Sequence, residues 1–547
     1  MTIFSILGMF MPSTESFAAP STNAGTITQQ LEQSEQFREQ QEVIEKKQQH
    51  GPQIDTDELP QDDGISLNST VEFQLNNVEI NKSEILTAQE INVLLKQYIG
   101  HMVTLSDLNK LLNKINALYK SKGYLAAKAV LPPQKIKKGS VQIRLIEGKI
   151  GAIDIEGNNS TNSDFITDSL ALSSGDLVEL KGLKKNLEKL NLVNDIQVGI
   201  ALKPGRKTGE TDYLLTVQEP KRQQAFVYTD NAGTKDVGLY RYGFNYVDRS
   251  LSGKRDLLTV GGYAARGTRA FYTSYKRPIN RLGTSLAVSG NVSTIEIVDG
   301  PIEPLAITGD SYNLGLELAH PVYAANNQLI TALFGLNKKK SSTDSANVTL
   351  FKTHINSWSA GIKRQAFSND SVSYASVRGT LAPTNWKNET SFFKINADFS
   401  YNKKLNDDWL ALFRLGGQWS DTKLLPSAEQ FQLGGIYTVR GYVEGLLIGD
   451  KGYYSSVELS HSVPKELKNL LGNAARYSVF LDHGAAIPFK GNGKNTNKDD
   501  YLTSLGLSVS AYLSKSISAT VTAAKPLFHR RDKKDSGRIN FNIQAYF

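Results

Sequence analysis

From about residue 222 to the C-terminus, short runs alternate apolar with small or polar residues, and helical periodicity is absent. Residues 504–511 alternate Ser or Gly with Leu, Val and Ala, and residues 538–547 place Ile, Phe, Ile, Ala and Phe on one side of an extended chain. A soluble sandwich shows the same alternation, but the small polar residues here favour a wet pore. About sixteen runs can be counted, so we predict a membrane β-barrel of about 16 antiparallel strands over residues 221–547.

Two units with a different pattern precede the barrel, at residues 70–148 and 149–220. Each is predicted to be α+β, with a strand, two helices and two strands in the order βααββ. In the second helix of the first unit, apolar residues recur at i, i+3, i+4, i+7 and i+10 from Leu108, as on one buried helix face. The expected elements lie at residues 71–80, 88–99, 106–122, 124–131 and 140–147, and in the second unit at residues 150–156, 164–172, 180–192, 196–202 and 212–219.

The N-terminal part is predicted to contain three segments. Residues 1–18 hold a short apolar stretch and end in small residues, as a signal peptide does, although no Lys or Arg precedes the apolar stretch. Residues 19–49 have high helix propensity, but their apolar residues are too sparse for a core-facing helix. Such a polar helix suits a wet lumen, and a disordered export tail has the same composition. Residues 50–69, with Pro, Gly and five acidic residues, are predicted to be a linker.

Composition narrows the possible functions. The chain of 547 residues carries a formal net charge of +8. Its basic clusters, at residues 338–340 and 530–534, lie between strand-like runs and are expected in solvated loops, so we expect no nucleic-acid partner. Cysteine is absent, which excludes disulfides and thiolate chemistry. No run approaches the roughly 18–20 apolar residues of a membrane helix.

The sequence has no motif for catalysis or cofactor binding. The Gly-Lys pair in residues 490–496 lacks the earlier glycine and the following Ser or Thr of a phosphate-binding Walker loop. Seven isolated histidines have no metal-ligand spacing, and no Gly-x-Ser-x-Gly elbow is present. We therefore expect neither an enzyme nor a bound cofactor or metal.

One connection in the barrel region does not look like a turn. Residues 436–445 join two strand-like runs and contain the motif Val439, Arg440, Gly441 and Tyr442. A run about forty residues later carries Phe480, Asp482 and Gly484 on one face of a strand. The Asp482 carboxylate can accept forked hydrogen bonds from the Arg440 guanidinium, and Gly484 leaves room for a close approach. We expect the connection to fold into the lumen and these two residues to pair.

Val-Arg-Gly-Tyr followed by Phe-x-Asp-x-Gly resembles the paired signature of the outer-membrane assembly-factor superfamily. The order and spacing most closely resemble its two-partner secretion transporters, the TpsB or haemolysin secretion/activation family of the ShlB/FhaC/HecB type. The βααββ units resemble the POTRA domain, and two copies is the number that these transporters carry. The terminal Phe547, after an alternating strand, resembles the signal that the barrel-assembly machinery reads.

The resemblance implies a pore in the outer membrane of a Gram-negative bacterium, surrounded by outer-membrane lipid. Its POTRA domains would lie in the periplasm and recognise an unfolded exoprotein of the TpsA type through an N-terminal secretion domain. It also implies that residues 19–49 hold a helix that plugs the barrel. Haemolysin, adhesin and contact-dependent toxin all fit as the exoprotein.

Two other functions fit parts of this pattern. A barrel-assembly or translocation factor of the same superfamily would share the barrel, but such factors usually carry more POTRA units and no N-terminal helix. A passive porin or receptor would need neither the POTRA domains nor the arginine motif.

Overall fold

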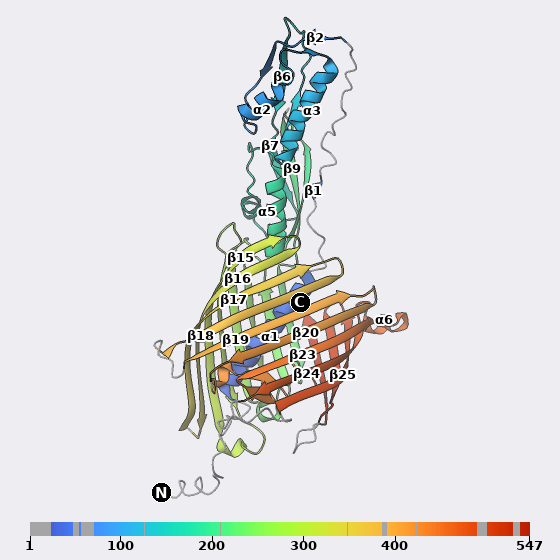
Figure 1. Ribbon diagram of the computed structural model, residues 1–547. Coiled ribbons are helices and arrows are strands. Elements are labelled where there is room, and N and C mark those ends of the chain that lie inside the picture. Colours follow the sequence, from blue (N-terminus) through green and yellow to red (C-terminus); the bar gives the residue numbers. More distant parts are fainter. Residues whose placement is uncertain are drawn as a thin grey trace.

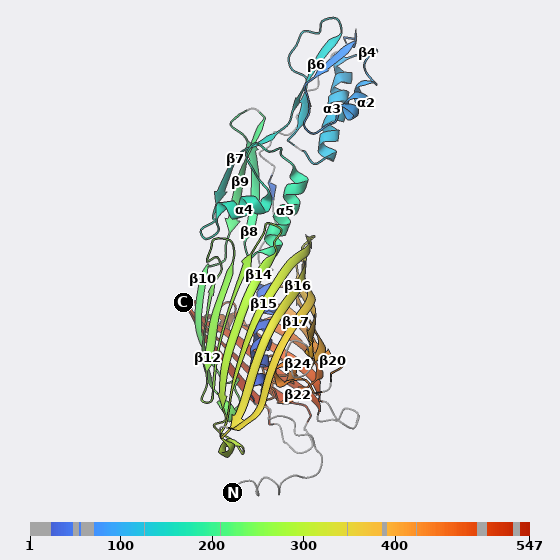
Figure 2. The same cartoon turned by 90° about the vertical axis from the view of Figure 1, so that its left-hand side faces the viewer.

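The computed structural model describes two α+β units and a barrel (Figure 1). It describes residues 23–46, 54–55, 71–124, 126–207, 209–346, 348–384, 391–422, 424–488, 500–528 and 536–547. The predicted signal peptide, residues 1–18, and the basic cluster 530–534 lie outside the described residues, as does the whole loop 490–496 with its Gly-Lys pair. The α+β units form an arm at one end of the barrel (Figures 1 and 2). We call this the proximal end and the opposite end the distal end.

The first α+β unit is built around helix α3 (Leu105–Ser121). Its other elements are β2 (Phe73–Gln74), β3 (Asn77–Ile80), α2 (Ala88–Leu95), β4 (Met102–Val103), β5 (Lys128–Val130) and β6 (Ser140–Ile146). Leu108, Leu111 and Ile115 of α3 are fully buried, as the helical period predicts. They pack on a sheet in which β6 lies between a parallel β3 and an antiparallel β5. This unit therefore has its own hydrophobic core.

Three elements of this unit are shorter than predicted. The strand expected over residues 71–80 is split into β2 and β3, because Leu75 between them turns into the core and its N–H donates to the carbonyl of His101. The helix expected over residues 88–99 ends at Leu95. The strand expected over residues 124–131 is reduced to β5. None of these changes alters the order of the elements.

The second α+β unit has the predicted βααββ order, without a counterpart of β4, and gains one strand from the linker. It contains β7 (Lys149–Glu156), α4 (Ser163–Leu170), α5 (Leu180–Val193), β8 (Gln197–Pro204) and β9 (Glu210–Gln218). The added strand, β1 (Ile54–Asp55), lies parallel to β8 at the edge of the sheet, with Ile54 opposite Ile200. The sequence predicts only a linker here, because two residues are too short to show a strand period.

Among the described residues, sixteen antiparallel strands close a barrel, which confirms the predicted fold. They are β10 (Gln223–Asp230), β11 (Arg241–Asp248), β12 (Leu257–Ala264), β13 (Thr268–Pro278), β14 (Ser285–Glu296), β15 (Ile307–Ala325), β16 (Gln328–Ser345), β17 (Val348–Phe367), β18 (Ser371–Ala382), β19 (Phe392–Lys404), β20 (Trp409–Ser420), β23 (Lys451–Ser462), β24 (Arg476–Ile487), β25 (Tyr501–Ser514), β26 (Ile517–Pro526) and β27 (Arg538–Tyr546). Exposed leucines such as Leu314, Leu316 and Leu318 line the outer face of β15. The alternate positions, such as Asn313 and Glu317, point inward, as in a membrane barrel.

The barrel closes where β27 pairs with β10. This seam has five residue pairs, from Phe226 to Asp230 of β10, whereas β10 and β11 share eight. Beyond β27, the N–H of Phe547 donates to the carbonyl of Ala225 at 2.9 Å. Its own carbonyl accepts from Lys221 Nζ at 3.0 Å, while its ring is exposed. Phe547 therefore extends the shortest pairing in the barrel.

Helix α1 (Ala24–Lys46) lies inside the barrel (Figures 1 and 2). Among its few apolar side chains, Ile27, Leu31 and Val43 are buried against the lumen lining. At its proximal end, Lys46 Nζ donates to the carbonyl of Leu192 in α5. None of the described helices is long and apolar enough to cross a membrane.

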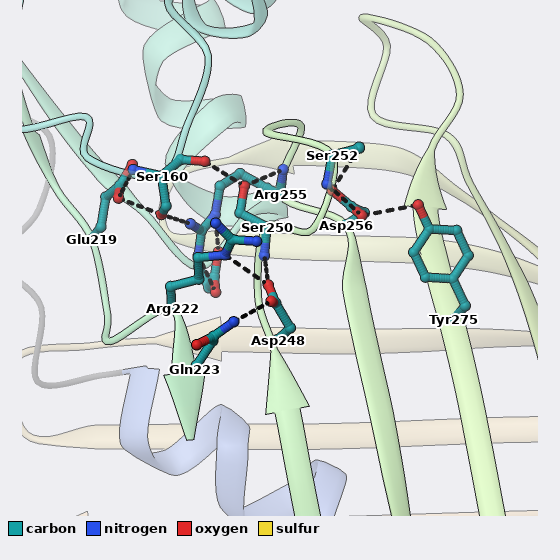
Figure 3. Close-up of polar contacts among 11 residues, drawn as sticks. Ser160, Glu219, Arg222, Gln223, Asp248, Ser250, Ser252, Arg255, Asp256 and Tyr275 are labelled. Carbon is teal, nitrogen blue, oxygen red and sulfur yellow. Dashed lines mark hydrogen bonds and ion pairs between the residues drawn. The ribbon is translucent and has the colours of Figure 1, made fainter. Parts of the chain in front are cut away.

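A polar junction fixes the second α+β unit to the barrel (Figure 3). The turn after β11 carries Arg255, whose backbone is left-handed (φ +58°) and whose side chain is fully buried. Its guanidinium donates to both carboxylate oxygens of Asp195, at 2.8 and 2.6 Å, and to the hydroxyl of Ser160 at 3.2 Å. Ser160 in turn donates to Glu219 and accepts from the Ser250 hydroxyl at 2.8 Å. These contacts link the end of α5 directly to a barrel turn.

The expectation for the basic cluster at residues 338–340 is wrong. These lysines lie within strand β16 rather than in a solvated loop. Lys339 points into the lumen and is buried, with Nζ 2.7 Å from Glu32 of α1 and 2.9 Å from Glu429. Lys338 and Lys340 occupy outward positions where an apolar residue is usual, so the three lysines hide the strand alternation.

Candidate functional site: the inward loop

The connection between β20 and β23, residues 421–450, folds back into the lumen, and we call it the inward loop. It contains a 3-10 turn, η4 (Ser427–Glu429), and a hairpin of β21 (Phe431–Leu433) with β22 (Leu447–Gly449). Its apolar side chains pack with residues of the wall in one cluster, formed by Phe431, Leu433, Val439, Tyr442, Tyr454, Ala486 and Leu502. Burial of these side chains favours the folded-in position over an extended loop.

The turn of the inward loop places Arg440 against β23 and β24. Its Nε and Nη2 donate to the two carboxylate oxygens of Asp482, at 2.8 and 2.9 Å, which is the forked geometry. The backbone N–H of Arg440 also donates to Asp482, at 3.1 Å. Nη1 donates to Glu458 at 2.7 Å, and Nη2 also donates to the Ser456 hydroxyl at 3.2 Å. Every nitrogen of the guanidinium therefore has a partner on the wall.

This contact is shielded from solvent. The Asp482 side chain has no exposed surface, and 12% of the Arg440 side chain is exposed. The guanidinium carbon lies 3.3 Å from the centre of the Phe480 ring, so a cation–π contact covers it. Removing one partner of a buried ion pair costs roughly 3–5 kcal/mol, and less where lumen water reaches the group left behind. We refer to this set of contacts as the loop lock.

Two glycines make the close approach possible. Gly441 has φ +89°, a conformation that residues with a Cβ rarely adopt, and an added Cβ would lie 3.0 Å from the Cβ of Ala524. An added Cβ at Gly484 would lie 2.7 Å from Leu433 Cδ1 of the loop and 2.5 Å from the carbonyl oxygen of Tyr453. Hence Gly441 allows the backbone conformation of the loop, and Gly484 leaves space on the wall for the loop to pack closely.

The structure brings together all seven motif residues that the sequence singles out, namely Val439, Arg440, Gly441, Tyr442, Phe480, Asp482 and Gly484. Tyr442 reaches past the lock, where its hydroxyl donates to the carbonyl of Thr503 at 2.9 Å. Phe547, the eighth candidate residue, lies at the seam between β10 and β27.

Sequence reasoning missed the charged partners that surround the motif. Glu458 shares Arg440 with Asp482 but belongs to no motif. Glu429 of η4 is almost fully buried between two wall lysines, 2.9 Å from Lys339 and 2.6 Å from Lys394. The period-two register of β16 and β19 points both lysines inward, but it does not reveal which loop residue lies opposite.

The inward loop and helix α1 touch along the lumen. Gln33 of α1 donates to the carbonyl of Gln432 at 3.1 Å, and the Gln432 side chain donates to the carbonyl of Thr26 at 2.9 Å. The rings of Phe37 and Tyr437 are 5.5 Å apart. A cavity of about 570 Å³ remains between the helix, the loop and the wall. Helix and loop thus occupy the lumen together.

Family models match most of the chain. The model described as haemolysin secretion/activation protein ShlB/FhaC/HecB matches residues 209–511, and a ShlB-type POTRA domain model matches residues 73–148. The heme/hemopexin transporter protein HuxB of Haemophilus influenzae strain 86-028NP is 29% identical over 495 residues, which cover 85% of this chain and 86% of that protein. The outer membrane transporter CdiB of Dickeya dadantii strain 3937 is 25% identical over 479 residues, covering 84% and 83%.

Solved structures share the fold over almost the full length. CdiB from Escherichia coli superposes with a TM-score of 0.68 at 19% identity, covering 98% of this chain and 100% of that chain. BamA from Haemophilus ducreyi lacking POTRA domains 1–3 gives a TM-score of 0.51 at 16% identity, covering 87% and 100%. The similarity therefore extends over the arm as well as the barrel.

The loop lock can be tested by exposure of the loop. Arg440→Ala should release the inward loop but leave the barrel intact, because the strand ladder does not include the loop. A cysteine replacing the buried Thr438 should then react roughly tenfold faster with a water-soluble maleimide, since the buried ion pair that protects it is lost. The amount of heat-modifiable barrel in the membrane should not change.

Further variants test whether the effect is specific to the contact between Arg440 and Asp482. Arg440→Lys should protect the cysteine only partly, because an ammonium cannot make the forked contact. Asp482→Ala should resemble Arg440→Ala, and the double variant should be little worse than either, as coupled partners are. Arg222→Ala, which breaks an ion pair to Asp248 at the proximal end, is the matched control. Fully additive effects of the two lock variants would mean that Arg440 and Asp482 act independently.

Proposed function

This chain belongs to the haemolysin secretion/activation (ShlB/FhaC/HecB) family, and from that premise we propose how its parts divide the work of two-partner secretion. The protein is an outer-membrane transporter that secretes an exoprotein, with its POTRA domains in the periplasm. The proximal end therefore faces the periplasm. The observation that carries the proposal is the filled lumen, in which α1 and the inward loop are held by contacts separate from the strand ladder.

We assign capture of the exoprotein to the β8 edge of the second POTRA domain. An extended segment can add to a free strand edge through backbone hydrogen bonds. In the resting protein β1 covers this edge with two residue pairs, and Ile54 packs against the domain core. Because β1 is so short, it competes only weakly with another segment for pairing with β8. An unfolded exoprotein segment that pairs over more residues displaces it.

We propose that displacement of β1 is coupled to opening of the pore. The linker that carries β1 follows α1 directly, so capture at β8 frees the segment that tethers the helix. Residues 19–49 then leave the lumen, and release of the loop lock widens the path. No nucleotide site is assigned. Folding of the exoprotein after it emerges supplies direction.

A role in secretion explains more of the structural features of this chain than a role in barrel assembly or as a passive porin does. A barrel-assembly factor shares the barrel and the loop lock, but it has no use for a helix that fills the lumen. A passive porin has no use for POTRA domains. The partner is accordingly a large exoprotein of the TpsA type, recognised through its N-terminal secretion domain while unfolded.

The first test of this proposal measures capture. A fragment of residues 71–220 should bind the N-terminal region of the exoprotein when that region is unfolded, and not when it is folded. A fragment of residues 50–220 should bind this region roughly fivefold more weakly. In that fragment β1 occupies the β8 edge, and displacing it costs about the net free energy of one hydrogen bond. Equal binding of folded and unfolded forms, measured by pull-down, would exclude strand addition. Equal binding by the two fragments would exclude competition from β1.

The second test measures the plug. Deleting residues 28–49 removes most of α1 and should raise single-channel conductance several-fold in planar bilayers, because the helix no longer fills the lumen. Secretion should remain possible. Heat-modifiability of the variant is the control for barrel assembly. Conductance equal to that of the full chain would assign this segment another role.

The third test concerns assembly. We propose that the barrel-assembly machinery recognises the edge of β27 together with Phe547. Removing Phe547 also removes a backbone hydrogen bond from the five-pair seam. The amount of heat-modifiable barrel in outer membranes should therefore fall. Phe547→Tyr, which keeps the aromatic ring and the backbone contact, is the control. Full assembly without Phe547 would contradict the assignment.

A further inference from the structure

Three cationic side chains form a cluster on the lumen wall in its proximal half. They are Lys276 of β13, Lys363 of β17 and Arg378 of β18, and the strand alternation points all three inward. Lys276 and Lys363 line one cavity, and Arg378 lies on β18, which pairs with the strand that carries Lys363. On the wall, the carboxylate of Glu317 pairs with Arg378 at 2.6 Å. We call these three cations the cationic cluster, and Glu317 balances one of them.

Helix α1 places two carboxylates against this part of the wall. Glu39 accepts from Lys363 Nζ at 2.5 Å and from the Tyr374 hydroxyl at 3.2 Å. Glu42, one helical turn along, lines the same cavity of about 300 Å³ as Lys276 and Lys363. Two carboxylates of the helix thus face the two wall cations that Glu317 leaves over. The helix also places Lys46 in this cavity, beyond the end at which Glu39 and Glu42 face the wall.

The position of the cluster matters for entry from the periplasm. The same cavity is bounded by Asn194 and Asp195 at the end of α5 and by Arg255 of the POTRA–barrel junction. A chain delivered by the second POTRA domain therefore meets the cationic cluster at the start of its path. Charges that line a narrow lumen with walls of low dielectric constant act strongly on a passing chain.

We propose that the cationic cluster is the entry site for an acidic segment of the exoprotein, and that Glu39 and Glu42 of α1 hold its place in the resting state. The inference rests on the proposed departure of α1 from the pore. Once the helix leaves, Lys276 and Lys363 lose the carboxylates that face them. An acidic segment restores these contacts, whereas a basic segment adds repulsion to two uncompensated charges.

The test uses the variant that lacks residues 28–49. In planar bilayers under a KCl gradient at low ionic strength, its reversal potential should show anion selectivity. Adding Lys276→Gln and Lys363→Gln should lower the anion-to-cation permeability ratio by about threefold or more. The matched control is Lys338→Gln with Lys340→Gln, which removes two lysines from the outer face of β16 and should leave the ratio unchanged.

The same channel distinguishes acidic from basic peptides. Deca-glutamate added on the periplasmic side should block the current at roughly tenfold lower concentration than deca-lysine, because the cluster attracts only the former. This preference should disappear in the Lys276→Gln, Lys363→Gln channel. A cation-selective pore, or equal block by the two peptides, would overturn the inference.

A charge swap in the full-length chain tests the pairing without the deletion. Lys363→Glu and Glu39→Lys should each raise conductance, because each places like charges face to face, and the double swap should lower it again. Failure of the swap to restore low conductance overturns the assignment of Glu39 to the cluster. An unchanged conductance in the deletion variant would instead contradict the plug, so the two failures are distinguishable.

Discussion

The forked contact between Arg440 and Asp482 is the interaction on which the position of the inward loop in the lumen depends. Asp482 is a carboxylate with no exposed surface, built into a strand of the wall. Without a cation it would be a buried, uncompensated charge, and that cost is what holds the inward loop in place. Glu458 adds a second carboxylate to the same guanidinium. The buried charge of Asp482 is thus compensated only when the loop supplies Arg440.

Helix α1 and the inward loop share one ion network but depend on it unequally. Lys339 contacts Glu32 of the helix and Glu429 of the loop, and Glu429 also contacts Lys394. If the helix leaves, Glu429 still pairs with both lysines. If the loop leaves, both lysines lose Glu429, and Asp482 loses Arg440 as well. The contacts therefore favour an order in which the helix leaves first and the loop second.

The sequence predicts what local pattern controls. Period-two alternation is enough for the barrel and for the inward direction of Asp482, and two short motifs are enough for the loop lock. The sequence does not predict a contact when the partner residue comes from a distant segment that has no helical or strand periodicity. The lysines at residues 338–340 have the composition of a loop until Glu32 and Glu429 are placed opposite Lys339. Strand β1 is invisible because two residues carry no pattern, and only the free β8 edge makes it a strand.

The contacts that hold the second POTRA domain on the barrel and those that hold β1 on this domain differ in strength. The second POTRA domain is held to the barrel by Arg255, whose buried guanidinium makes a forked contact with Asp195. This contact favours a fixed position of the domain on the barrel. The β1 strand, with two residue pairs, is held far less firmly on the same domain. This difference agrees with the proposal that displacement of β1, rather than movement of the whole domain, is coupled to the lumen.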